Sequence, residues 1–512
     1  MTSPSSDHDN ETDVPGWLQS GKAFANRGLV KRIDTHAAIV FLSGDRAWKM
    51  KRPVSLGYLD FSTPARRKAA LNTELRLNRR TAPSLYRAVH PITAGADGRL
   101  QLDGAGEPID WLLEMQRFPD DALLAEVANH GGLDEPLLRS LTDSIVAFHG
   151  DAAVSADGHG SSNVRDVIKG NMDSMARFPA VLDQASVQAV SKRLLMMADK
   201  YATLLDARAR AGRVRHCHGD LHLANIALID GVPTPFDCLE FDTALATTDV
   251  LYDLAFLLMD LWERGLRHES NVVFNRYLDL SAQDEAGVGL LPMFMAMRAS
   301  IRAHVLAAQG AGPTDQLFVR ARHYLALASD LAGVSEARLV AIGGLSGTGK
   351  STLARSIGGD VGRAPGARIL RSDVLRKRLA GFRPEVRLPA SAYTQKMSTK
   401  VYRELDRVGG ATLAAGISVI ADAMFARPVE RSTIKSVADA HHARFAGMWL
   451  HVSDAVRLQR VVERPLEASD ADITVARAQF VQPGSEPLDW TIVDARVSLD
   501  QLRSIVMGVL NA

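Results

Sequence analysis

The chain has 512 residues, too many for one hydrophobic core, so several folding units are expected. Its formal net charge of +1 excludes a strong overall field that would attract nucleic acid or an anionic membrane. Because Cys217 and Cys238 are the only cysteines, a disulfide framework is excluded too, and two buried thiols in a reducing compartment are expected.

The amino-terminal segment MTSPSSDHDNETDVP is polar and acidic, and it has no apolar core of the kind that signal peptides and membrane anchors contain. We predict residues 1–25 to be a disordered tail. The most apolar segment further along, residues 251–262, contains Asp253 and Asp260, so no membrane span is expected. A cytoplasmic protein is therefore predicted.

Two alternating segments, residues 37–42 and 47–51, flank a short polar turn and predict a β-hairpin. Lys49 and Lys51 fall on the same face of this hairpin, because alternate residues of a strand point to the same side. The following helix carries Glu74 beside its apolar stripe, where a carboxylate is costly unless it is paired. Glu74 is thus the expected partner of Lys49, which large apolar residues flank.

The loop HGDLHLAN, residues 218–225, holds an acid and an amide at the spacing that protein-kinase-like folds use. There Asp220 would accept the proton of an acceptor hydroxyl, and the amide oxygen of Asn225 would bind magnesium. Asp237 follows at the distance of a second hairpin strand and would add a metal-binding carboxylate. The closely spaced histidines of this loop are expected to be structural.

These residues resemble the aminoglycoside phosphotransferase family of kinase-like enzymes. The resemblance covers residues 28–330 and implies an α+β kinase-like two-lobed domain within residues 26–333. It also implies five roles: Asp220 as catalytic base, Asn225 and Asp237 as magnesium ligands, Lys49 as phosphate-binding lysine, and Glu74 as its partner. Asp249 and Asp253 resemble the family's acids that brace the catalytic loop.

Beyond a boundary between Gly333 and Arg338, apolar strand candidates alternate with helices. The strand candidates are residues 339–343, 368–370, 418–421, 445–452 and 491–493. Such alternation predicts a mainly parallel sheet. Residues 338–512 are therefore predicted to be an α/β P-loop NTPase domain.

The P-loop itself is the segment GLSGTGKS, residues 344–351, placed between an apolar strand and a helix. Its glycines let backbone amides surround the phosphates, Lys350 reaches the terminal phosphates as a catalytic cation, and the Ser351 hydroxyl binds magnesium. The predicted nucleotide-binding residues are Gly344, Ser346, Gly347, Thr348, Gly349, Lys350, Ser351 and Thr352.

Two acids stand at strand ends of this domain. Asp373 lies where a base beside an anionic or polyhydroxylated acceptor would be expected. Asp422 ends the next apolar strand and could hold magnesium, directly or through water, or contact the acceptor. For either acid, a helix cap or a surface ion pair is the alternative.

Four arginines are candidate acceptor or lid residues. Arg376 follows Asp373 on a short helix, and Arg427 follows Asp422. Arg460 and Arg464 share one helix face at i,i+4 spacing and could close over the transferring phosphoryl group. A solvated helix face would show the same spacing.

With these residues, the segment 338–512 resembles small P-loop kinases of the group that contains gluconate kinase, chloramphenicol phosphotransferase, polynucleotide kinase and zeta toxins. The resemblance implies an AAA-type ATP-binding domain. It also implies kinase chemistry with Asp373 as base.

The sequence thus predicts two kinase-type domains that transfer the γ-phosphoryl group of Mg·ATP to hydroxyl groups of small molecules. Neither nucleic acid nor a membrane is expected as a partner, and the oligomeric state is not indicated. One alternative is a regulatory, nucleotide-sensing pseudokinase, because no glycine-rich segment lies between Gly28 and Ala38 and Cys238 replaces the glycine usual after the metal-binding acid. Another is a P-loop domain that phosphorylates the 5′-hydroxyl of nucleic acid.

Overall fold

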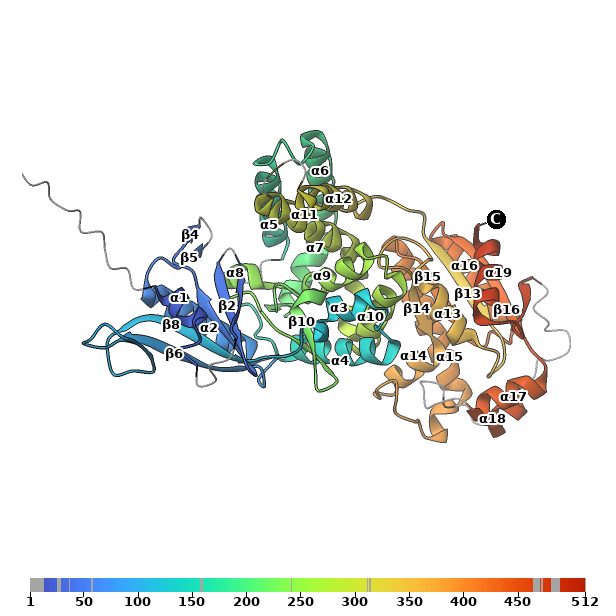
Figure 1. The fold of residues 1–512 in the computed structure, drawn as a ribbon. Helices are drawn as coiled ribbons and strands as arrows, with labels where there is room; N and C mark the ends of the chain where they lie inside the picture. The colour runs from blue at the N-terminus through green and yellow to red at the C-terminus, as the bar shows by residue number, and fades with distance from the viewer. Residues whose placement is uncertain are drawn as a thin grey trace, which may run out of the picture. The chain divides into compact units, whose positions relative to one another are not determined.

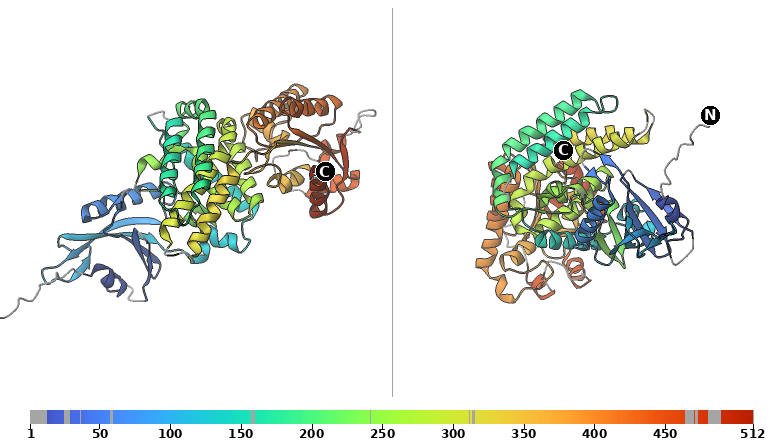
Figure 2. Two further views of the ribbon diagram at one scale, coloured as in Figure 1. Left: turned by 90° about the horizontal axis from the view of Figure 1, so that it is seen from above. Right: turned by 90° about the vertical axis from the view of Figure 1, so that its left-hand side faces the viewer.

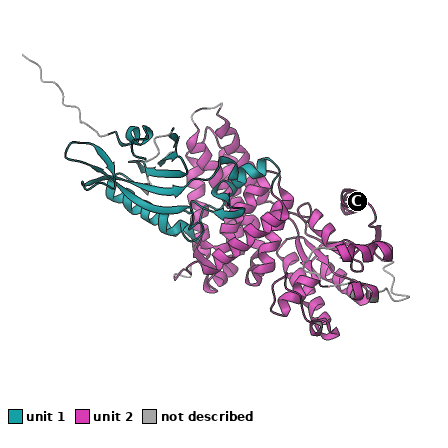
Figure 3. Ribbon diagram, turned by 60° about the horizontal axis from the view of Figure 1, so that its bottom comes forward, with its two compact units in different colours: residues 1–132, 218–247 teal, residues 133–217, 248–512 magenta. Residues whose placement is uncertain are grey.

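The computed structural model describes residues 13–24, 29–35, 37–56, 59–156, 160–240, 242–310, 312, 315–463, 470, 473–479 and 489–511. None of the helices within these ranges is long and apolar enough to cross a membrane. The chain divides into two compact units (Figure 3): unit 1 is residues 1–132 with 218–247, and unit 2 is residues 133–217 with 248–512. The predicted domain boundary at residues 333–338 lies inside unit 2.

Unit 1 is built on a six-stranded antiparallel sheet with the strand order β1-β2-β3-β8-β6-β7. In that order the strands are Lys31–Asp34, Ala38–Ser43, Arg46–Lys51, Pro108–Gln116, Tyr86–Ala94 and Leu100–Leu102. The predicted hairpin is confirmed as β2 and β3, in which Val40 pairs with Lys49. Helix α2 (Pro64–Asn78) packs against β6 and β8, so Glu74 comes from the helix that covers this sheet.

The remaining elements of unit 1 are short. They are β4 (Ser55–Leu56), β5 (Leu59–Asp60), η1 (Asp120–Ala122), α3 (Leu124–Asn129), η2 (Leu223–Asn225), β10 (Ile226–Ile229), β11 (Val232–Pro235) and α8 (Thr243–Ala246). Strands β10 and β11 form the second hairpin that the spacing of Asn225 and Asp237 predicts.

The predicted tail is too long, because a helix lies within it. Helix α1 (Val14–Gln19) begins after Asp13, whose carboxylate accepts a hydrogen bond from the Gly16 amide. Its Leu18 is fully buried and joins a core cluster that also contains Phe24. The apolar side chains that follow the acidic segment bind this part of the chain to unit 1.

The first part of unit 2 is helical. Its helices are α4 (Glu135–Asp151), α5 (Ser161–Ala176), α6 (Gln184–Lys200), α7 (Ala202–Arg210), α9 (Val250–Glu263), α10 (Arg267–Leu280), η3 (Ala282–Leu290), α11 (Leu291–Gln309) and α12 (Gln316–Leu331), with the short strands β9 (Val214–His216) and β12 (Thr247–Asp249). Helix α11 packs against both α9 and α12, in the green-to-yellow part of Figure 2.

Helix α9 accounts for the apolar segment near residue 255, since it is buried from Val250 to Leu261. The two acids at its start have buried partners within unit 2. The Asp249 carboxylate accepts two hydrogen bonds from Arg208, each 2.7 Å long, and the Asp253 carboxylate lies 3.1 Å from His149 Nε2.

The second part of unit 2 is a five-stranded parallel sheet with the strand order β14-β15-β13-β16-β17 (Figure 1). In that order the strands are Arg368–Arg371, Val419–Asp422, Arg338–Gly343, Arg444–His451 and Thr491–Asp494. All five predicted strands are present. The α+β class predicted for the amino-terminal part and the α/β class predicted for the carboxy-terminal part are therefore confirmed.

Helices complete this α/β part. They are α13 (Lys350–Gly358), α14 (Ser372–Leu379), η4 (Ala390–Tyr393), α15 (Gln395–Ala414), α16 (Pro428–Ala440), α17 (Asp454–Glu463), α18 (Ile473–Ala478) and α19 (Leu499–Asn511). One apolar cluster joins the sheet to α13 and α19, and another joins it to α15 and α16, so both faces of the sheet are covered. The carboxyl ends of β13, β14 and β15 lead into the predicted P-loop, Asp373 and Asp422.

Candidate active sites

The P-loop joins β13 to α13, as the sequence predicts. Gly344, Gly347 and Gly349 have φ angles of 139°, 90° and 93°, a region that residues with a side chain rarely adopt. A Cβ atom on Gly347 would lie 2.3 Å from the Arg457 carbonyl oxygen, and one on Gly344 would lie 2.7 Å from that of Leu450. Conformation therefore favours glycine at all three positions, and lack of space requires it at Gly344 and Gly347 as well.

Within the P-loop, Lys350 Nζ donates a hydrogen bond of 3.0 Å to the Leu345 carbonyl oxygen, to which Thr348 Oγ1 also donates at 2.8 Å. The backbone amide of Ser346 donates to Gln479 Oε1 at 2.9 Å. This amide and this ammonium group are donors of the kind that P-loops offer to phosphate oxygens.

Ser351 and Asp422, predicted as magnesium ligands, lie together. Ser351 Oγ donates to Asp422 Oδ2 at 2.5 Å, and Arg371 Nε is 3.6 Å from the same carboxylate oxygen. The pairing of Ile342 with Asp422 between parallel β13 and β15 brings the acid beside the P-loop. A hydroxyl and a carboxylate are hard oxygen donors, which Mg²⁺ prefers, so these two residues fit the predicted cation.

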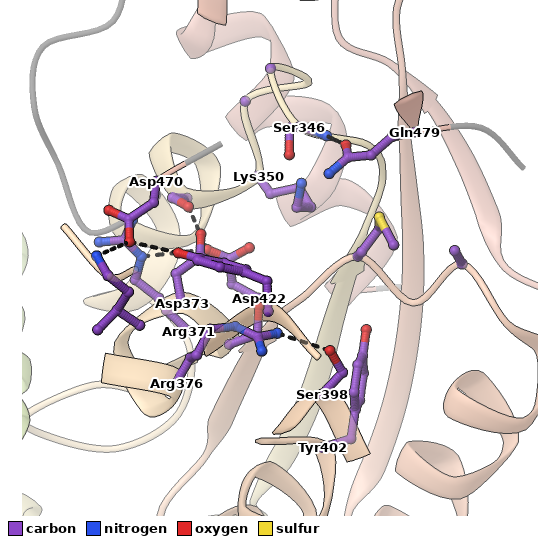
Figure 4. A pocket seen from close by; sticks show the side chains of 18 of the residues that line it. Ser346, Lys350, Arg371, Asp373, Arg376, Ser398, Tyr402, Asp422, Asp470 and Gln479 are labelled. Carbon is purple, nitrogen blue, oxygen red and sulfur yellow. Dashed lines mark hydrogen bonds and ion pairs between the residues drawn. The ribbon is translucent and has the colours of Figure 1, made fainter. Parts of the chain in front are cut away.

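A cavity of about 960 Å³ opens around these groups (Figure 4). Among the predicted site residues, those that line it are the P-loop residues 346–347 and 349–352 together with Asp373, Arg376, Asp422, Arg427 and Arg460. Gly344 and Thr348 are not among its lining residues, which fits their structural contacts. Asp373 stands in the first turn of α14 and thus shares one space with Lys350.

The kinase-like site of unit 1 is assembled from four separate segments. Lys49 Nζ lies 2.7 Å from Glu74 Oε1 and 2.9 Å from Asp237 Oδ1, so the predicted lysine pairs with both predicted acids. Asn225 Nδ2 donates to Asp220 Oδ2 at 2.8 Å. The predicted base and the predicted metal-binding amide are therefore in direct contact.

Asp237 has a left-handed backbone with a φ of 61°, and its amide donates to the Tyr86 hydroxyl at 3.2 Å. The next amide, that of Cys238, donates to Asn78 Oδ1 at 2.8 Å. These bonds fix the turn that follows β11 and thereby aim the Asp237 carboxylate at Lys49.

Lys51 is an additional member of this site that the sequence did not single out as a partner. Its Nζ atom lies 2.8 Å from Glu74 Oε2 and 2.5 Å from Glu240 Oε1, and only 2 % of its side chain is exposed. Burial by itself would raise the pKa of Glu74, but the ammonium groups of Lys49 and Lys51 hold it below its ordinary value. Glu74 is thus an anion between two cations, and it pairs with Lys51 as well as with the predicted partner Lys49.

The sequence model of the AAA domain family matches residues 339–483. The predicted P-loop domain is thereby confirmed. Curated relatives from Mycobacterium bovis and Mycobacterium tuberculosis, both described as uncharacterized proteins, are 29% identical over 454 residues, which cover 87% of this chain and 88% of theirs.

Three solved structures are among those to which the chain is similar. A gluconokinase from Sinorhizobium meliloti is 19% identical, covering 35% of this chain and 94% of its own, with a TM-score of 0.26. A thermostable mutant of aminoglycoside phosphotransferase APH(4)-Ia is 14% identical, covering 60% and 94%, with a TM-score of 0.37. A choline/ethanolamine kinase family protein from Mesorhizobium loti is 12% identical, covering 62% and 93%, with a TM-score of 0.39.

The arginines predicted as acceptor or lid residues have different surroundings. Arg376 Nη1 donates to the Ala392 carbonyl oxygen at 3.1 Å, and its guanidinium lies over the Tyr393 ring. Arg427 forms an ion pair of 2.7 Å with Glu430. Arg460 donates to the Ala495 carbonyl oxygen at 3.0 Å, whereas Arg464 lies outside the described residues, so the lid stays a prediction.

Asp470 connects two segments beside the cavity that the sequence gives no reason to join. Its carboxylate accepts hydrogen bonds from the Tyr393 hydroxyl at 2.6 Å and the Leu388 amide at 2.9 Å, and it lies 2.9 Å from Lys377 Nζ. Burial raises the pKa of Tyr393, and so does its bond to Asp470. Each partner is distant in sequence, so no local pattern could have indicated these contacts.

Proposed function

We propose that the protein is an ATP-dependent phosphotransferase and that its P-loop site transfers the γ-phosphoryl group of Mg·ATP to a hydroxyl group of a small molecule. The observation that carries the proposal is the single cavity of about 960 Å³ that Lys350, Ser351, Asp422 and Asp373 line together. The P-loop, the paired oxygen donors Ser351 and Asp422, and Asp373 at the start of α14 thus face one space (Figure 4).

In this proposal the P-loop amides and Lys350 bind the phosphates and stabilise the charge that develops on the transferred group. Ser351 and Asp422 would hold a magnesium ion, which would supply positive charge against the phosphates. Asp373 accepts the proton of the acceptor hydroxyl while the acceptor oxygen bonds to the γ-phosphorus and the bond to ADP breaks.

We further propose that the site of unit 1 is a second kinase-type site, which would make the protein bifunctional. Asp220 would be the base, Asn225 and Asp237 the magnesium ligands, and Lys49 the cation on the nucleotide phosphates. The direct contacts Lys49–Glu74, Lys49–Asp237 and Asn225–Asp220 support this assignment.

The test measures ADP release from Mg·ATP across pooled sugars, amino alcohols, nucleosides, aminoglycosides and oligonucleotides. The parent chain is compared with full-length Asp373→Asn and Asp220→Ala variants. We expect each variant to lose one acceptor class and keep the other. Transfer by neither site would contradict the proposal, no acceptor for the Asp220-dependent site would favour a regulatory unit 1, and a response to oligonucleotides alone would favour a 5′-hydroxyl kinase.

A further inference from the structure

We propose that the helical part of unit 2 positions the acceptor side of the P-loop site, and that Glu285 is the central positioning residue. The proposal rests on the proposed phosphotransferase function of that site. It concerns the segment from Arg368 to Arg378, which forms β14, carries Asp373 and ends in α14.

The start of this segment is held by a buried cluster of charges. Arg368 donates from Nε to Glu285 Oε1 at 2.8 Å and from Nη2 to Oε2 at 3.1 Å, while its Nη1 donates to Asp279 Oδ1 at 2.8 Å. Only 1% of the Arg368 side chain is exposed. A buried guanidinium requires such partners, and here they come from α10 and η3.

The backbone of the same segment is bonded to α10. The Ile369 amide donates to Asn275 Oδ1 at 2.7 Å, and the Ala367 carbonyl oxygen accepts from Asn275 Nδ2 at 3.1 Å and from Asn271 Nδ2 at 2.9 Å. Because β14 is the edge strand of the described sheet, these asparagines bond to it where a neighbouring strand would otherwise stand. Helix α10 lies against β14 and α13 (Figure 1).

The end of the segment has the same anchor as its start. Arg378, in the last turn of α14, donates from Nη1 to Glu285 Oε2 at 2.9 Å and from Nη2 to the Ala282 carbonyl oxygen at 3.1 Å. One carboxylate therefore holds both ends of the segment, and Asp373 lies between them. A second anchor is Arg276 of α10, which lies beside Glu385 in the loop after α14.

The anchored strand leads directly into the cavity. Arg371 ends β14, pairs in register with Asp422, and lines both the large cavity and a small pocket of about 80 Å³ beside α10. Glu285, Arg368 and Arg378 are not among the residues that line the large cavity, so they would act through the position of Asp373 and Arg371. They are positioning residues.

The experiment uses the full-length chain with Asp220→Ala, so that turnover reports on the P-loop site. The reaction measured is the hydrolysis of ATP, with water as the acceptor. Glu285→Gln keeps the shape of the side chain and removes its charge, and Arg378→Met removes one anchor while leaving the buried Arg368 pair. The control is Glu336→Gln, which disrupts an exposed pair with Arg444 in the same unit. Circular dichroism first checks that every variant is folded under the conditions used. We then measure ADP release, Mg·AMP-PNP affinity and peptide-resolved hydrogen exchange.

We expect Glu285→Gln to lower kcat by about 10- to 100-fold, because small misplacements of a catalytic group have effects of that size. The KM for Mg·ATP should stay within about twofold, since the P-loop contacts are unchanged. Hydrogen exchange should rise in residues 368–379 and not in β13 or α13. Arg378→Met should change the same quantities in the same direction by less, and Glu336→Gln should match the parent.

Unchanged kcat and unchanged exchange in residues 368–379 for both variants would overturn the proposal. So would a uniform rise in exchange across unit 2 with loss of nucleotide affinity, because the carboxylate would then support the fold as a whole. If the parent shows no Lys350-dependent ADP release, the proposed function fails, and the exchange measurements still decide whether Glu285 orders the segment that carries Asp373.

Discussion

The two candidate sites of this chain are built in different ways. At the P-loop site, one contiguous segment would supply the phosphate-binding groups, and three of its residues are glycines in backbone conformations that other residues rarely adopt. In unit 1 the proposed phosphate binding would depend on side chains from distant segments, with Lys49 paired to both Glu74 and Asp237. A site built from backbone amides depends on the conformation of a few residues. A site built from side chains depends on all the ion pairs that hold those side chains in place.

The largest effect that this difference predicts is that of Lys350→Ala. The substitution removes the only cation that the P-loop motif itself contains, and it leaves the proposed phosphate site without the lysine that would neutralise the terminal phosphates. We expect no detectable turnover at the P-loop site and unchanged turnover at the Asp220-dependent site, measured by ADP release with site-specific acceptors. Lys435→Ala on an exposed position of α16 is the control, and persistence of all activity in Lys350→Ala would contradict the site assignment.

The two proposed bases should respond alike, in spite of the different construction of their sites. We expect Asp373→Asn and Asp220→Ala each to slow transfer at their own site by about 10²- to 10⁴-fold, which is the usual contribution of a positioned base. Nucleotide affinity should survive in Asp373→Asn, because the proposed role of Asp373 is toward the acceptor and not toward the nucleotide. Calorimetry with Mg·AMP-PNP checks this, and a collapse of affinity without a fall in kcat would make Asp373 a metal or structural residue.

Buried and exposed arginines of unit 2 should differ in their effect on stability. Arg368→Ala removes the buried guanidinium that lies between Glu285 and Asp279 and leaves Glu285 with Arg378 as its remaining cation. The free energy of unfolding should therefore fall by about 3–5 kcal/mol. Arg444→Ala removes an exposed ion pair with Glu336 and should cost about 0–1 kcal/mol. Urea unfolding, monitored by hydrogen exchange of peptides in β14, measures the free energy of unfolding of both variants. Equal losses of stability would show that the Arg368 cluster contributes no more than a surface ion pair.

The smallest effect concerns pH. Burial alone would raise the pKa of Glu285, but Arg368 and Arg378 hold it below its ordinary value. A lowered folded-state pKa means that this stability is present above the unfolded pKa of about 4.3 and is lost as the pH falls through the folded pKa. The free energy of unfolding should therefore decline with acidification below about pH 5, and less steeply in Glu285→Gln. If the free energy of unfolding changes with pH equally in the parent and in Glu285→Gln, the titration of Glu285 does not contribute to the acid sensitivity of the fold.

The sequence predicted what adjacent residues and regular spacing can carry. The P-loop, the five parallel strands and the Asp220–Asn225 loop all follow from local patterns, and Glu74 follows from the cost of an acid beside an apolar stripe. The contacts of Lys51 with Glu240, Asp470 with Tyr393 and Arg368 with Glu285 were not predicted. Each joins residues from separate elements, and a charged residue in a sequence does not show which opposite charge it meets after folding.

The asparagines of α10 at the edge of the sheet also bear on how the chain can be divided. A free edge strand presents unpaired amides and carbonyl groups to any other strand, and proteins cover such edges to avoid aggregation. Removal of the residues before Arg338 would uncover β14 and would also leave the Arg368 guanidinium without Asp279 and Glu285. The helices before Arg338 thus protect the P-loop domain against self-association by covering this edge strand. Truncation at the predicted boundary, residues 333–338, should yield a protein that aggregates through β14.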